Sequence, residues 1–161
     1  MRVLFLSLFV LMAAMATFGQ KNVVSPSENA TLEETSKWLV SNFVKYSKYT
    51  TPGREFSVSN AKFASCKLNY TEITRFGSTS YAVMGSTVTR TNSKRDLTID
   101  LTAVDPTKIE TADHLLPDLR YIRLAKRSAG LSPIELVVKA EAANALRSAL
   151  ARGATLCSKP N

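Results

Sequence analysis

The feature that most constrains the fold is a run of short alternating segments enclosed by two helical patterns. Apolar residues spaced three and four apart after Thr31 predict a helix that ends near Ser47. Residues 139–157 are rich in Ala, Leu and Arg and predict a second helix. The segments between them read as strands and turns. Strands grouped between two helices indicate an antiparallel sheet, because parallel neighbours need long crossover connections.

The start of the first helix carries a specific local signal. Thr31 is followed three residues later by Glu34, which is the pattern of a capping box. The Thr31 hydroxyl is expected to accept from the Glu34 amide, and the Glu34 carboxylate to reach back to the Thr31 amide. Leu39 and Phe43 then lie on one face of the predicted helix.

The strand region alternates between apolar and polar residues. Ala64, Cys66, Leu68 and Tyr70 alternate with polar neighbours and predict one strand with one apolar face. A hairpin is predicted from segments 81–90 and 97–101, which enclose a polar turn. Three further short strands are expected at 108–111, 121–126 and 134–138. The expected fold class is therefore α+β. We expect an antiparallel, strongly bent sheet or partial barrel of about six or seven strands, flanked by an N-terminal and a C-terminal helix.

Residues 1–19 have the pattern of a secretory signal peptide. Arg2 precedes an apolar run from Val3 to Ala16 that ends in small residues, so cleavage is expected after residue 16 or 19. A membrane anchor is the alternative, but a spanning helix needs about 20 apolar residues and this run is shorter. Residues 20–30 are then a flexible arm and residues 31–158 a single domain. The expected location is secreted or periplasmic, and no later segment is expected to span a membrane.

The two cysteines, Cys66 and Cys157, are predicted to lie on apolar faces that point at the same core. In the oxidising compartment that a leader implies, a disulfide between them is expected. The alternative is a pair of buried thiols that pack as small apolar side chains.

The charge balance is basic. The net charge is +8, and loss of Arg2 with the leader leaves 20 Lys and Arg against 13 Asp and Glu, a net of +7. Such a surface favours anionic partners, so we expect contact with an anionic lipid, a glycan or an envelope protein. The alternative is that the cations are scattered and only keep the chain solvated. The candidate anion-contact residues are Lys94, Arg95, Arg120, Arg123, Lys126 and Arg127. No nucleic-acid-binding motif is present.

Few residues suit catalysis. His114, the only histidine, follows Asp113, and a Ser-His-Asp arrangement would have to use it. Zinc and calcium sites need more ligands than the sequence groups together, so no metal or cofactor is expected. A carboxylate pair is a further alternative, and its candidates are Asp96, Asp100 and Asp105.

Several of these features together resemble a group of uncharacterised secreted bacterial domains. The features are Trp38-Leu39, Cys66, the segment 101–109 and an Ala-rich last helix that ends in Leu156-Cys157. The resemblance implies a bacterial origin and a structural pairing of the cysteines, and it implies no known activity. The expected shape is also similar to the pleckstrin-homology architecture, and a shape by itself assigns no function.

We therefore expect a non-catalytic extracytoplasmic binding or interaction module, with an anionic ligand among the candidates. The alternatives are a small secreted hydrolase that uses His114 or a carboxylate pair, and a structural component of the cell envelope.

Overall fold

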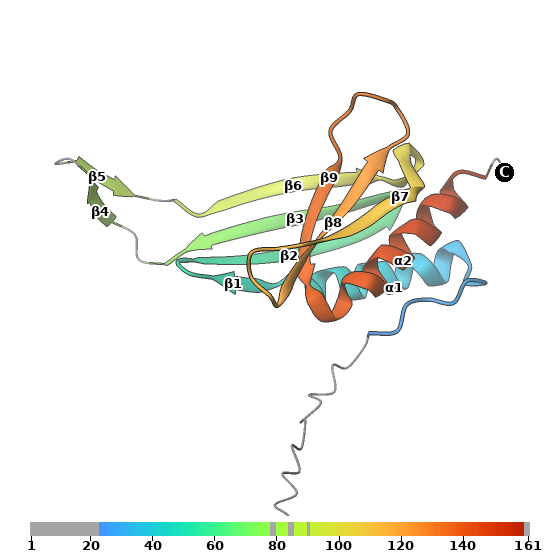
Figure 1. The fold of residues 1–161 in the computed structure, drawn as a ribbon, viewed down its shortest axis with the longest axis horizontal. Coiled ribbons are helices and arrows are strands. Elements are labelled where there is room, and N and C mark those ends of the chain that lie inside the picture. The colour runs from blue at the N-terminus through green and yellow to red at the C-terminus, as the bar shows by residue number, and fades with distance from the viewer. Residues whose placement is uncertain (1–22, 78–79, 84–85, 90, 160–161) are drawn as a thin grey trace, which may run out of the picture.

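The structure, a computed structural model, describes residues 23–77, 80–83, 86–89 and 91–159 (Figure 1). The predicted signal peptide and its cleavage positions lie outside these residues. None of the helices in the described part of the chain is long and apolar enough to cross a bilayer. The elements are, in chain order, α1 (Leu32–Tyr46), β1 (Tyr49–Thr51), β2 (Arg54–Ala64), β3 (Lys67–Phe76), β4 (Ser80–Val83), β5 (Ser86–Thr89), β6 (Ser93–Asp100), η1 (Leu101–Ala103), β7 (Val104–Asp113), β8 (Leu119–Lys126), β9 (Ile134–Lys139) and α2 (Ala140–Cys157).

The strands form two main antiparallel sheets. The first sheet has the order β1-β2-β3-β6 and the second has the order β7-β8-β9, while β4 and β5 pair only with each other. The prediction of an α+β fold is confirmed. The prediction of one bent sheet or partial barrel is wrong, because the two sheets do not join into a barrel. The chain leaves the first sheet at η1, where Asp100 caps the turn through the Thr102 amide (3.0 Å).

The predicted hairpin of 81–90 with 97–101 is also wrong. β6 pairs with β3 along its whole length, with Leu97 opposite Tyr70 and Ile99 opposite Leu68. This pairing places apolar side chains of both strands on one face of the sheet, where they enter the core. Between these two strands in the sequence, β4 pairs with β5 in a separate two-stranded sheet.

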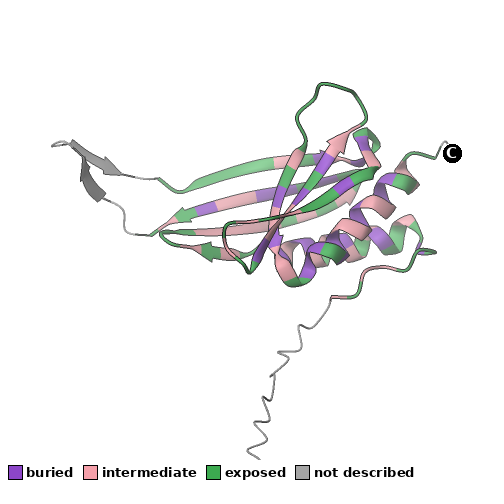
Figure 2. Cartoon of the chain, viewed as in Figure 1, coloured by how far each residue is buried: buried purple, intermediate pink, exposed green. Residues whose placement is uncertain are grey.

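The two helices lie side by side on one side of the molecule, and do not flank the sheet as expected (Figure 1). α1 packs on β2 and on α2, and α2 packs on η1 and on the second sheet. Buried residues gather where these layers meet (Figure 2). The helices contribute to this core through Leu39, Phe43, Leu146 and Leu150, each at most 2% exposed.

One glycine allows this close packing. A Cβ on Gly153 of α2 would lie 2.9 Å from the Cδ1 atom of Leu101 in η1 and 3.7 Å from that of Leu39 in α1. The missing side chain at this position therefore lets α2 pack closely against both η1 and α1.

The described part of the predicted arm, residues 23–30, is anchored at both ends. Val23 packs against the core, and Ala30 is buried. The Arg152 guanidinium of α2 donates to the Ala30 carbonyl through Nε (3.1 Å) and a terminal nitrogen (2.8 Å).

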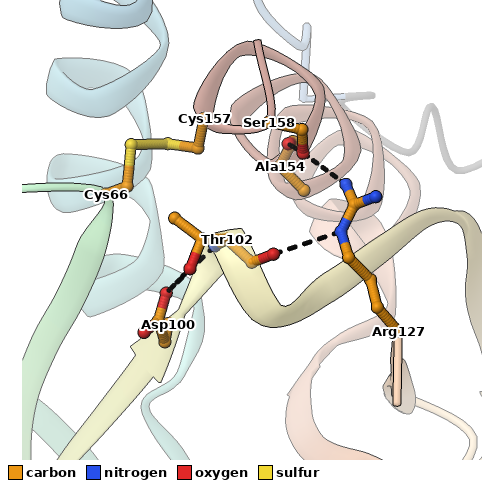
Figure 3. Close-up of a disulfide and its surroundings, with 7 residues drawn as sticks. All are labelled: Cys66, Asp100, Thr102, Arg127, Ala154, Cys157 and Ser158. Atoms are coloured by element: carbon orange, nitrogen blue, oxygen red, sulfur yellow. Dashed lines mark hydrogen bonds between the residues drawn. A yellow bond between two sulfur atoms is a disulfide. The ribbon is translucent and has the colours of Figure 1, made fainter. Parts of the chain in front are cut away.

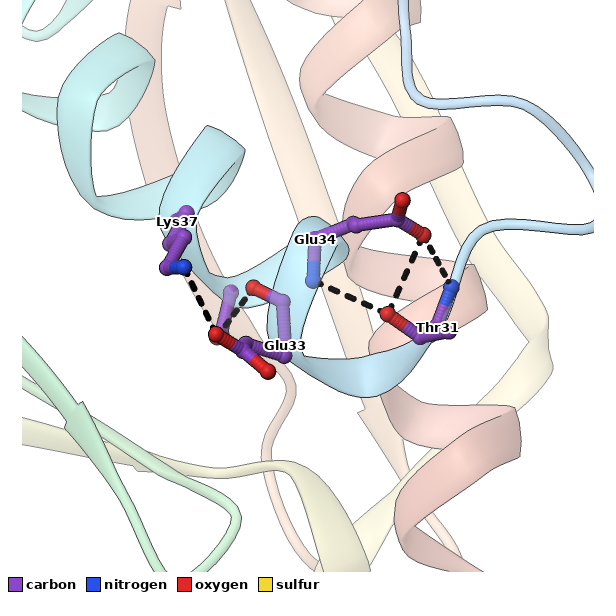
Figure 4. A network of polar contacts seen from close by, with 5 residues as sticks. Thr31, Glu33, Glu34 and Lys37 are labelled. Carbon is purple, nitrogen blue, oxygen red and sulfur yellow. Dashed lines mark hydrogen bonds and ion pairs between the residues drawn. The ribbon is translucent and has the colours of Figure 1, made fainter.

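The predicted capping box at the start of α1 is confirmed (Figure 4). The Glu34 amide donates to Thr31 Oγ1 (3.2 Å), and the Thr31 amide donates to Glu34 Oε2 (2.8 Å). The Thr31 hydroxyl also donates to Glu34 Oε2 (3.0 Å). The bonds that the Thr31 amide and hydroxyl donate lower the pKa of the Glu34 carboxyl below its ordinary value of 4.5.

We predict that Thr31→Ala lowers the free energy of unfolding by about 1 kcal/mol near neutral pH, because α1 loses its cap. The depressed pKa means that the Glu34 contribution is present above pH 4.5 and is lost as the pH falls through its lower folded value. Urea unfolding should therefore show a smaller effect in acid. Thr50→Ala, at an exposed position of β1, is the control and should change stability little. If Thr31→Ala lowers the free energy of unfolding equally in acid and at neutral pH, the Glu34 carboxylate does not contribute to the cap.

The predicted disulfide is present, and it closes the corner of the molecule where α2 ends (Figure 3). Cys66 and Cys157 are 91 residues apart in sequence, with Cα atoms 5.7 Å apart. Cys66 lies in the turn between β2 and β3 with a φ of 60°, and not on a strand face as predicted. Arg127 strengthens the same corner, since its Nε donates to the Thr102 carbonyl (3.1 Å) and its guanidinium bonds Ser158.

We predict that the double variant Cys66→Ser/Cys157→Ser unfolds at lower urea concentration. The chain-entropy model gives a loss of about 4–5 kcal/mol for a loop of this length. Reduced wild-type protein is the matched control and should lose a similar amount. The disulfide itself is checked by intact mass after alkylation without reductant, where two alkylated cysteines would contradict it.

Candidate functional site

A cleft of about 380 Å³ lies between the two sheets. The second sheet crosses one end of the long first sheet, whose strands extend beyond it (Figure 1). The edge strand β9 contributes four successive residues, 134–137, to the cleft. β9 pairs only with β8, so its other edge is free. These four residues make β9 one wall of the cleft.

The floor of the cleft is one face of the first sheet. The pairing registers place Val58, Glu72 and Arg95 in one row across β2, β3 and β6, and Tyr70 beside Leu97 in the next row. These side chains share a face because they stand at even spacings along their strands. The floor therefore combines apolar and aromatic side chains with one central charged pair.

Aromatic rings close the end of the cleft near α1. Phe43 of α1 meets Tyr70 edge to face at 5.0 Å between centroids, and Tyr49 of β1 stacks on Phe56 of β2 at 4.9 Å. All four residues line the cleft. Rings that already pack on one another form a preorganised surface for a ligand's apolar groups.

The charged pair on the floor joins neighbouring strands. The Arg95 guanidinium bonds the Glu72 carboxylate at 2.5 Å. The Glu72 side chain is 28% exposed and that of Arg95 is 66% exposed, so the guanidinium keeps surface available to a ligand. Burial raises the pKa of both Tyr49 and Tyr70 to about 12, with the Glu72 carboxylate adding to the shift. Both phenols therefore stay protonated at neutral pH.

Ser47 adds a polar group to the wall. It follows α1, lines the cleft and is 4% exposed. Its Oγ has no hydrogen-bond partner among the described residues. A buried hydroxyl without a partner is unfavourable by about 1–3 kcal/mol.

We predict that Glu72→Gln lowers the pKa of Tyr49 and Tyr70, because the substitution removes a negative charge that opposes their ionisation. Ring NMR signals of tyrosine, followed with rising pH, measure both values. Since the folded values exceed the ordinary 10.0, these tyrosines favour the folded state fully below pH 10, and the contribution is lost as the pH rises through about 12. Glu141→Gln, at an exposed position of α2, is the control and should leave both values unchanged.

The six candidate anion-contact residues are spread over both sheets. Arg95 lines the cleft, while Lys94 precedes it on β6 and so points to the opposite face. Arg120 and Lys126 lie near opposite ends of β8. The rise per residue of a strand places them about 20 Å apart. The structure therefore does not gather the six into one patch.

Four of these six cations already have partners within the chain. The pairing of Arg95 with Glu72 and the contacts of Arg127 at its corner are described above. In addition, Arg120 pairs with Asp113 (3.3 Å), and Arg123 pairs with Glu135 (2.8 Å). Lys94 and Lys126 form no ion pair with any described residue. Anion binding by the six residues stays a prediction.

The candidate catalytic histidine lies outside the cleft. His114 Nδ1 accepts from the Leu116 amide (3.0 Å), and its ring packs on Tyr121 with centroids 4.9 Å apart. Its neighbour Asp113 is engaged by Arg120.

The candidate carboxylates have local structural roles. Asp96 accepts from Thr71 Oγ1 (2.7 Å), and Asp100 and Asp105 accept from hydroxyls two residues further on. Those hydroxyl bonds lower the pKa of Asp100 and Asp105, which is the opposite of what a general acid needs. The described residues contain no cluster of three or more His, Cys, Asp or Glu that could hold a metal ion.

Arg95 was the one cleft-floor residue proposed for a site from the sequence, as an anion contact, whereas Glu72 and the apolar floor residues were not proposed. The available signal was that Phe56 and Val58 stand two residues apart, as do Tyr70 and Glu72. This spacing predicts strands, but it does not predict which face of the sheet a second sheet will cross. No protein-family model, curated protein or solved structure matches this chain. The resemblance to secreted bacterial domains stays a prediction.

Proposed function

We propose that this chain is a non-catalytic, extracytoplasmic binding module that holds its ligand in the cleft between the two sheets. The observation that carries the proposal is the apolar and aromatic floor with the Glu72–Arg95 pair at its centre. The cleft volume lies within the range of about 300–1,000 Å³ that is usual for ligand sites. Such sites combine apolar lining with a few placed polar groups.

Two observations support a location outside the cytoplasm. Residues 1–19 have the sequence pattern of an export signal. The Cys66–Cys157 disulfide belongs to a type of bond that persists in oxidising compartments and is rare in the cytosol.

The chemistry of the cleft supports binding over catalysis. Tyr49 and Tyr70, with pKa values near 12, offer hydrogen bonds at neutral pH and do not act as bases there. His114 and the three candidate aspartates are not among the residues that line the cleft.

The charges of the cleft favour a protein over an anionic lipid or glycan among the expected partners. Its lining contains two carboxylates, Glu72 and Glu135, and one guanidinium, Arg95. Glu72 bonds Arg95, and Glu135 is bonded by Arg123. No excess of positive charge therefore faces a ligand, and an apolar segment of an envelope protein fits the lining better.

We predict that small apolar probes bind this cleft. Indole, dodecanoate and a heparin fragment are titrated separately, and the amide NMR signals of the oxidised chain are followed. Indole should shift signals of floor residues such as Phe56, Val58 and Leu97. The variant Leu97→Trp fills the cleft and should weaken indole binding about tenfold or more, a change of about 1.4 kcal/mol.

Lys94→Trp is the matched control, because it places the same side chain on the opposite face of β6, and it should bind indole like the wild type. Heparin binding that disappears with salt and shifts only Lys and Arg signals would favour the anion-contact surface instead. Indole shifts that are equal in both variants would place the binding elsewhere and end this proposal.

A further inference from the structure

β9 lines the cleft, and its free edge is the least protected edge of the two main sheets. Of the other edge strands, β1 is only three residues long, β6 carries consecutive charged residues at 94–96, and β7 carries Pro106 and a register shift after Val104. Short strands, charged side chains, prolines and irregular registers protect sheet edges from further pairing. β9 is regular along its whole register with β8, contains no proline, and is uncharged over 136–138.

The register identifies which backbone groups of β9 point into the cleft. The Ala140 amide donates to the Asp118 carbonyl (2.8 Å), and these two residues continue the register in which Lys139 lies opposite Leu119. Hydrogen-bonded and non-hydrogen-bonded pairs alternate along antiparallel strands. The residues of β9 that bond to β8 are therefore the even-numbered ones. Glu135 and Val137 direct their amides and carbonyls away from β8.

Both outward-directed residues line the cleft. No hydrogen bond joins the backbone of Glu135 or Val137 to any other described residue outside the β8 ladder. The cleft thus presents unpaired amides and carbonyls along one wall, beside an apolar floor. Backbone groups spaced along a strand match another extended backbone better than they match a compact small molecule or a lipid chain.

We propose that β9 accepts an extended peptide segment of a partner protein, which adds as a further strand to the second sheet inside the cleft. This proposal rests on the cleft being the ligand site. Main-chain bonds to Glu135 and Val137 would supply affinity, and every second side chain of the peptide would face the floor.

The floor specifies the chemistry of that peptide. Its inward side chains meet Val58, Leu97 and the Tyr70–Phe43 aromatic pair, so they are apolar or aromatic. The charges of the floor are paired with each other, so the central segment of the peptide is uncharged.

The experiment selects displayed random heptapeptides on the oxidised full-length mature chain and measures the affinity of synthetic versions. We expect peptides with apolar residues at alternate positions. Each peptide is then N-methylated at one position at a time. Methylation should reduce affinity about tenfold or more at alternate positions only, because only alternate amides face β9.

A pair of variants of the protein tests the same main-chain hydrogen bonds by changing β9 instead of the peptide. Val137→Pro removes an outward amide that β8 does not use, and proline is tolerated on the free side of an edge strand. Val137→Ala keeps the amide and removes the side chain. Val137→Pro should weaken the selected peptides at least tenfold while urea unfolding stays cooperative, and Val137→Ala should weaken them much less. If Val137→Pro does not fold, the N-methyl series decides.

The outcomes separate this proposal from the proposed function. Peptides that shift the floor signals but show no alternation on N-methylation would overturn strand addition and leave the cleft as a binding site. If no peptide is selected while indole still binds the cleft, strand addition is likewise overturned and the cleft remains a binding site. A dimer of the chain itself that dissociates on Val137→Pro would make a second copy the occupant and overturn the partner peptide. Loss of both peptide and indole binding would end both proposals.

Discussion

The rest of the structure depends on the corner where the chain passes from the first sheet to the second. η1 turns the chain there, and Leu101 is fully buried beneath Gly153 of α2. The Cys66–Cys157 disulfide and the Arg127 contacts hold the same corner (Figure 3). The crossing of the second sheet over the first is set at this point. The cleft exists because that crossing leaves the edge of β9 above the face of the first sheet.

Features encoded over a few residues were predictable from the sequence. The capping box of Thr31 and Glu34 and both helices follow from local spacing, and the disulfide follows from two cysteines in an expected oxidising compartment. The partner of β6 was not predictable, because its pairing with β3 depends on apolar residues distant in sequence. Polar turn residues around position 92 indicated a hairpin, and this local signal was overridden by the longer β3–β6 ladder.

The candidate site was less predictable than the fold. Lys94 and Arg95 were predicted to belong to one anion-contact surface, yet they point to opposite faces of β6 because strand side chains alternate. The same alternation placed Arg95 beside Glu72, a partner more than twenty residues away in sequence. Of the carboxylates that suggested chemistry, Asp100 and Asp105 bond to residues two positions further on, and Asp96 bonds Thr71 across neighbouring strands. A cleft formed by two sheets depends on how they cross, which single-strand patterns do not encode.

The disulfide divides the chain into a covalent ring and a tail. Residues 66–157 form the ring, which contains β3 to β9 and α2, whereas α1, β1 and β2 precede it. The cleft takes its β9 wall and the larger part of its floor, on β3 and β6, from the ring. The tail supplies the β2 part of the floor together with Phe43, Ser47 and Tyr49. A single peptide-bond break inside the ring leaves its two pieces joined, but a break before Cys66 frees a lining segment. The oxidised bond thus secures one side of the cleft covalently, while the other is held only by packing and hydrogen bonds.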